Sequence, residues 1–124
     1  MNRYDPLQAP SAAEWLELDE GERIELARQY HLRRRIKMPN LRLHAVTHAI
    51  VENQLAEGLA VVEAALQRLL ADGLDRHEAV HAIGSVLMGH IWNLENKPPP
   101  EGDPNAAYFR ALEQLTAASW RASE

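Results

Sequence analysis

The chain has 124 residues, of which 46% are hydrophobic and 25% are charged, and its formal net charge is −5 at pH 7. This length and composition predict a single globular domain spanning residues 1–124, with a core that needs no disulfides. The sequence contains no cysteine, so thiolate ligands are excluded and a metal site must use nitrogen and oxygen donors. The acidic charge argues against a nucleic-acid partner, which favours a basic surface.

The first ten residues are mostly polar and include two prolines. They lack the charged-then-apolar order of a signal peptide, and we expect residues 1–10 to form a flexible N-terminal arm. No apolar run approaches the roughly 20 residues needed to cross a bilayer. We therefore expect a cytoplasmic protein without a membrane partner.

Helix-start and helix-stop residues divide the remaining chain into predicted helices over residues 11–18, 19–36, 41–57, 59–71, 75–95 and 103–120. Three capping-box patterns mark helix starts: Ser11 with Glu14, Asp19 with Glu22, and Asp75 with Glu78. Gly58 and Gly73 mark helix ends, Pro98–Pro100 end the fifth helix, and Asp103 with Pro104 begins the last. No segment has the alternating pattern of a strand, so the sequence predicts an all-α fold, a compact helical bundle of four to six helices.

Two histidine pairs indicate specific chemistry. His44 and His48 are four residues apart in one predicted helix, and His77 and His81 are four apart in another. Residues at this spacing share a helix face, so each pair can offer two imidazoles to one metal ion. Glu52 continues the face of the first pair by another turn.

Both pairs lie in the first turns of their helices, and one helix separates these two helices in the sequence. In an up-down bundle the two histidine helices would run in the same direction, with both pairs at the same end. We therefore expect His44, His48, His77 and His81 to meet at one metal ion, with Glu52 beside them.

Two carboxylates have alternative roles. Glu52 is either a direct ligand or a carboxylate that orients a histidine. Glu78 lies within the sequence HEAVH, which matches the H-E-x-x-H arrangement of zinc hydrolases and makes it a candidate general base. Its place three residues after Asp75 equally suits a helix cap. For His31 and His90 we expect surface or boundary positions.

Residues 43–55 (LHAVTHAIVENQL) and 77–81 (HEAVH) resemble an uncharacterised bacterial family of small all-helical proteins, classed as a domain of unknown function. A segment over residues 87–92, the following prolines and a helix containing Ala107 and Tyr108 are also similar. The resemblance covers about the C-terminal two-thirds of the chain and joins two separate histidine motifs. It implies that His44, His48, Glu52, His77 and His81 act as one unit, and it carries no activity.

The sequence thus predicts a protein that binds a divalent transition metal, with zinc first and nickel, iron or manganese as further candidates. Four histidine ligands would close a structural zinc site, whereas three and a water would leave a site open for metal-assisted hydrolysis. The alternative is an interaction module without enzymatic activity, such as a homodimer, in which the histidines and glutamates form a metal-free hydrogen-bond network.

Overall fold

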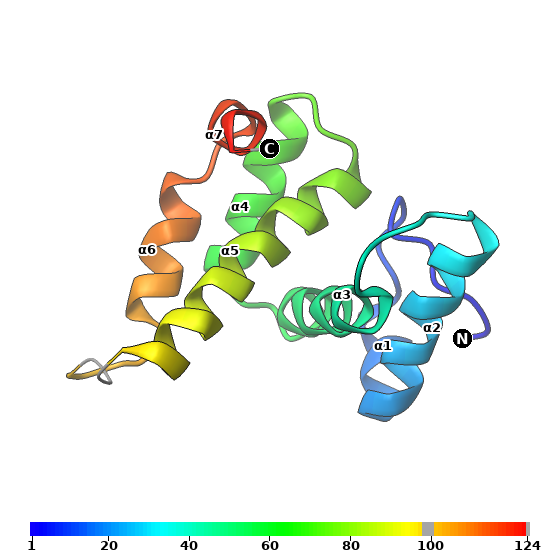
Figure 1. Ribbon diagram of the computed structural model, residues 1–124. Helices are drawn as coiled ribbons and strands as arrows, with labels where there is room; N and C mark the ends of the chain where they lie inside the picture. The colour runs from blue at the N-terminus through cyan, green and yellow to red at the C-terminus, as the bar shows by residue number, and fades with distance from the viewer. Residues whose placement is uncertain (98–100, 124) are drawn as a thin grey trace. The chain divides into compact units, whose positions relative to one another are not determined.

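A computed structural model describes residues 1–97 and 101–123, and all regular secondary structure in these residues is α-helical. The all-α prediction is confirmed. In chain order the helices are α1 (Ala12–Glu17), α2 (Glu20–Arg33), α3 (Leu41–Ala56), α4 (Ala60–Ala71), α5 (Arg76–Asn96), α6 (Ala106–Gln114) and α7 (Ala117–Ala122) (Figure 1). Within the described ranges no helix is long and apolar enough to cross a membrane.

Local sequence signals account for most helix ends. The side chains of Ser11, Asp19 and Asp75 each accept a hydrogen bond from the backbone amide three residues later, as predicted for N-caps. Gly58 and Gly73 follow α3 and α4 with φ angles of 75° and 100°, a conformation that glycine adopts without strain. The predicted terminator Pro98–Pro100 lies outside the described residues, and α5 ends at Asn96.

The last predicted helix is wrong in two respects. It begins at Ala106, three residues after Asp103, and it is interrupted between α6 and α7. Leu115 has an extended conformation, and the hydroxyl of Thr116 accepts from the amide of Ser119 while the Ser119 hydroxyl accepts from the amide of Thr116. This reciprocal capping starts a new helix, so the segment predicted as one helix forms two helices, α6 and α7.

The chain divides into two compact units, and the first, Met1–Leu59, contains α1, α2 and α3. Both α1 and α2 pack against α3. The centre of this unit combines aromatic rings with small residues that let the helices approach closely. Its buried members are Tyr4, Trp15, Ala27, Tyr30, Ala45 and Ala49.

The second unit, Ala60–Glu124, contains α4, α5, α6 and α7. In this unit α4, α5 and α6 pack against one another. Arg68 on α4 donates to the backbone carbonyls of Leu112 and Leu115, and Asp72 accepts from the amide of Ala117. These bonds satisfy backbone groups where α6 ends and α7 begins. Whether the two units act as the single domain predicted for residues 1–124 stays a prediction.

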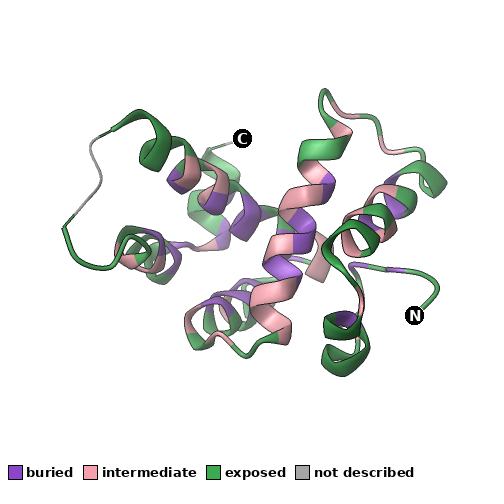
Figure 2. Cartoon of the chain, turned by 90° about the horizontal axis from the view of Figure 1, so that it is seen from below, coloured by how far each residue is buried: buried purple, intermediate pink, exposed green. Residues whose placement is uncertain are grey.

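In each unit the buried positions recur along the helices and alternate with exposed ones, as amphipathic helices require (Figure 2). The buried apolar residues of the second unit include Val62, Leu66, Leu69, Val80, Ile83, Leu87, Tyr108 and Leu112.

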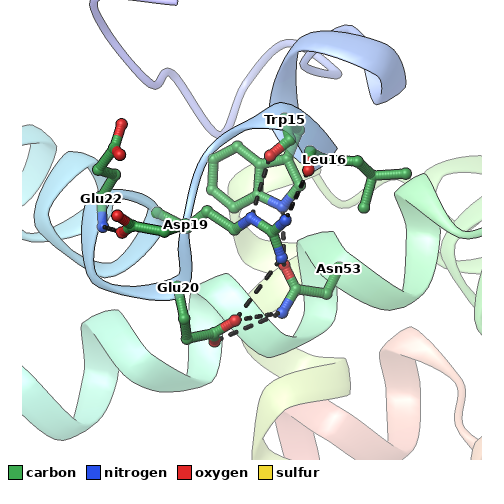
Figure 3. A network of polar contacts seen from close by, with 7 residues as sticks. Trp15, Leu16, Asp19, Glu20, Glu22 and Asn53 are labelled. Carbon is green, nitrogen blue, oxygen red and sulfur yellow. Dashed lines mark hydrogen bonds and ion pairs between the residues drawn. The ribbon is translucent and has the colours of Figure 1, made fainter.

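A polar network joins the three helices of the first unit (Figure 3). The side-chain oxygen of Asn53 on α3 accepts from the Trp15 indole at 2.9 Å and from the Arg23 guanidinium at 3.0 Å. Arg23 also donates to the carbonyls of Trp15 and Leu16 at 3.0 Å and lies 3.6 Å from Glu20. The network links α1, α2 and α3 to one another. Its central residue, Asn53, directly follows Glu52 in the sequence.

We expect Asn53→Ala to lower the free energy of unfolding by about 1–3 kcal/mol, because the fully buried Trp15 indole loses its acceptor. The matched control is Asn93→Ala at an exposed position on α5. This substitution should change the free energy of unfolding by no more than about 0.5 kcal/mol. Urea unfolding of both variants measures the difference. Equal stabilities of the two variants would contradict a structural role for the network.

Candidate metal centre

Three histidines of the first unit lie together. The ring centroids of His31 and His44 are 4.6 Å apart, those of His31 and His48 are 4.9 Å apart, and those of His44 and His48 are 4.7 Å apart. One ring nitrogen from each histidine lies within 4.8 Å of the others. His44 and His48 thus lie together, as their spacing on one helix predicts. The third imidazole, that of His31, comes from another helix.

The hairpin formed by α2 and α3 explains why these residues meet. His31 lies in the last turn of α2, whereas His44 and His48 lie in the first two turns of α3. Between the helices Arg35 has a φ of 55°, and the amide of Ile36 bonds the carbonyl of His31 at 3.0 Å. This helix ending reverses the chain, with an arginine where glycine is usual.

His31 is fully buried, so the expected surface or boundary position is wrong. Its Nδ1 lies 2.7 Å from the backbone carbonyl oxygen of Ala27, one helical turn earlier. A carbonyl oxygen can only accept, so Nδ1 carries the proton and donates. In the neutral ring the lone pair is then on Nε2, the form in which many metal-binding histidines are held.

His48 is backed by a tyrosine and a carboxylate. Tyr4, which precedes the first helix, is 0% exposed, Glu52 is 1% exposed and His48 is 2% exposed. The Tyr4 hydroxyl donates a hydrogen bond to Glu52 Oε2 and lies 3.1 Å from His48 Nδ1. The Tyr4 hydroxyl therefore connects the Glu52 carboxylate to Nδ1 of the His48 imidazole by two hydrogen bonds.

The second histidine pair lies in the other unit. His77 is half-buried and His81 is exposed, and the His81 ring lies 5.3 Å from that of Trp120. The amide of Glu78 donates to the Asp75 side chain at 2.8 Å, so Asp75 is the N-cap of α5, and a role for the Glu78 side chain as base or in a capping box stays a prediction. That His77 and His81 join the first pair also stays a prediction.

His90, for which we expected a surface or boundary position, is 9% exposed. It is buried on α5 and its ring stacks on that of Tyr108, with centroids 5.6 Å apart and an angle of 23° between the planes. A packing role in the second unit accounts for this histidine.

Sequence reasoning missed Tyr4 and His31. The signal for His31 was its position four residues after Ala27 and one after Tyr30, on the buried face of α2. Tyr4 offered only an aromatic side chain in a polar segment. Its partners lie 44 and 48 residues away, and no local pattern encodes that distance.

The geometry suits an imidazole-bound ion. Three histidines on one tetrahedral zinc, with Zn–N distances of about 2.0–2.1 Å, would place their ring centres about 5 Å apart. The observed separations of 4.6–4.9 Å are within a few tenths of an ångström of that value. The nitrogens are thus close enough together for the cluster to hold a metal ion.

Comparisons with models of known families, with curated proteins and with solved structures find no match. The resemblance to an uncharacterised family stays a prediction.

In the metal-free protein we expect diethyl pyrocarbonate to modify His81 well before His31 and His48. The reagent must reach a ring nitrogen, and His81 is exposed whereas His31 and His48 become accessible only when the structure opens locally. Mass spectrometry of peptides taken over time measures the three rates. Equal rates would contradict the burial of the cluster.

Proposed function

We propose that the protein binds one divalent transition-metal ion, with His31, His44 and His48 as ligands and zinc as the first choice. The observation that carries the proposal is the convergence of one nitrogen from each of these rings within 4.8 Å. Imidazole is a good ligand for zinc, and it also suits iron and nickel. Manganese prefers oxygen donors, so a centre of this composition favours it least.

The hydrogen bonds support one of the two roles predicted for Glu52. Its carboxylate accepts from Tyr4, whose hydroxyl lies at Nδ1 of His48. A carboxylate in that position orients a histidine ligand and raises its basicity. We therefore propose that Glu52 acts behind His48 and does not bind the ion directly.

The fourth ligand decides the chemistry. The sequence predicts that His77 and His81 are ligands together with His44 and His48, and four histidine ligands would close the site and make it structural. A water in the fourth position would instead leave it open, and the bound water could then be activated for hydrolysis. Glu78 is the candidate base for that second case.

The competing function is an interaction module without a metal, such as a homodimer. The Tyr4, His48 and Glu52 hydrogen bonds suit that function as well, because they satisfy buried polar groups without an ion. Metal content separates the two functions.

Elemental analysis of the protein without a histidine tag should find about one equivalent of transition metal per chain. We expect His44→Ala and His48→Ala to lose it, and we expect added zinc to raise the melting temperature of the wild-type protein only. His90→Gln, which removes a histidine from the second unit, is the matched control and should keep the metal. Circular dichroism checks that each variant is folded.

If the wild-type protein holds no metal and zinc leaves its melting temperature unchanged, the metal proposal is wrong and the hydrogen-bond network is structural. Equal metal loss in the folded His90→Gln variant would also contradict the assignment, because that histidine stacks on Tyr108 in the second unit.

If the predicted second pair supplies ligands, we expect His77→Ala and His81→Ala each to weaken zinc binding, because each substitution removes one imidazole from the predicted ligand set. Competition with a fluorescent chelator measures both affinities. Wild-type affinity in both variants would show that the second pair supplies no ligand.

A further inference from the structure

The N-terminal segment enters the core of the first unit at Tyr4. The Tyr4 ring centroid lies 5.4 Å from that of Trp15, 6.4 Å from that of Tyr30 and 6.0 Å from that of His48. Arg33, in the last turn of α2, donates to the backbone carbonyl of Tyr4 at 3.3 Å. A residue that precedes the first helix is thereby held at the side of the histidine cluster.

The direction of the hydrogen bonds follows from the number of protons. The Tyr4 hydroxyl has one proton, and it is donated to Oε2 of Glu52. The phenol oxygen then faces His48 Nδ1 at 3.1 Å as an acceptor, so Nδ1 must carry the proton that is donated to it. The chain of donors runs from His48 through Tyr4 to Glu52.

We propose that Tyr4 is a positioning residue that holds His48 in the tautomer with the proton on Nδ1. A neutral imidazole in water prefers the proton on Nε2, so this contact reverses the intrinsic preference. The lone pair of His48 is then on Nε2. The same holds for His31, whose Nδ1 proton is donated to the Ala27 carbonyl. The consequence for metal affinity rests on the proposed function; the tautomer itself does not.

The N-terminal segment therefore prepares the cluster. While Tyr4 is docked, His31 and His48 both have Nδ1–H bonded to an acceptor within the unit, and their rings are fixed for coordination through Nε2. Without the hydroxyl, His48 would return toward the solution tautomer and Glu52 would lose a donor. Metal affinity would then depend on a residue that never touches the ion.

Tyr4→Phe tests the proposal, because it keeps the packed ring and removes only the hydroxyl. Long-range proton–nitrogen NMR of the metal-free, full-length protein reads the tautomer of each neutral histidine. We expect the Nδ1–H tautomer for His48 in the wild-type protein and a shift toward Nε2–H in Tyr4→Phe. His31 serves as the internal reference and should stay Nδ1–H in both, because its acceptor is a backbone carbonyl.

Zinc affinity is the second readout, and Tyr4→Phe should lower it about 10- to 100-fold, the usual effect of losing a hydrogen bond to a ligand. Tyr108→Phe is the matched control: it removes the same group from a buried tyrosine of the second unit and should change neither the His48 tautomer nor the affinity.

The outcomes separate the two proposals. An Nε2–H tautomer of His48 in the wild-type protein, or an unchanged tautomer in folded Tyr4→Phe, overturns the role of Tyr4 whether or not zinc binds. A tautomer that follows the Tyr4 hydroxyl in a protein that never binds metal supports the role of Tyr4 and overturns the metal proposal. Unchanged zinc affinity alongside a changed tautomer would show that positioning by Tyr4 does not serve the metal.

Discussion

The burial of Glu52 is the constraint on which the first unit depends. A carboxylate removed from water costs free energy unless hydrogen-bond donors replace the water it loses. The unit supplies one such donor from Tyr4, outside the helices, so docking of the N-terminal segment brings a hydrogen-bond donor to this carboxylate. The same contact sets the environment of His48, and the buried aromatic rings around Tyr4 keep water away from it.

The hairpin of α2 and α3 supplies the second half of the arrangement. Its turn places the end of one helix beside the start of the next, so His31 meets His44 and His48 without any long insertion or separate ligand loop. The positive end of a helix dipole disfavours a protonated imidazole, and His44 lies in the first turn of α3, where this effect acts. The same dipole would repel a bound cation, and a nearby carboxylate such as that of Glu52 would offset part of that repulsion.

The helices could be predicted from sequence because their signals are local. Asp19, Asp75, Gly58 and Gly73 each determine the backbone within a few residues, and the observed helix ends follow them closely. The pairing of His44 with His48 is local in the same sense, since helical spacing alone puts the two rings 4.7 Å apart.

What sequence reasoning did not find depends on tertiary contacts. His31 joins the cluster only because the chain reverses after Arg35, and Tyr4 joins only because the core of three helices accepts its ring. The break at Leu115 was missed for a related reason. Its carbonyl bonds Arg68 of α4, so packing against another helix accompanies the interruption of an otherwise continuous helical pattern.

The metal proposal rests on two observations of the cluster, the hydrogen bonds at its ring nitrogens and the closeness of its three rings. His31 and His48 each use Nδ1 as the donor to an acceptor within the unit, so Nε2 presents its lone pair in both neutral rings. With His44 added, three rings bring one nitrogen each to within 4.8 Å, close to a buried carboxylate. Under the proposed function, a divalent ion would take one ring nitrogen of each histidine as a ligand, and the bonds at Nδ1 of His31 and His48 would fix the orientation of two of the three rings.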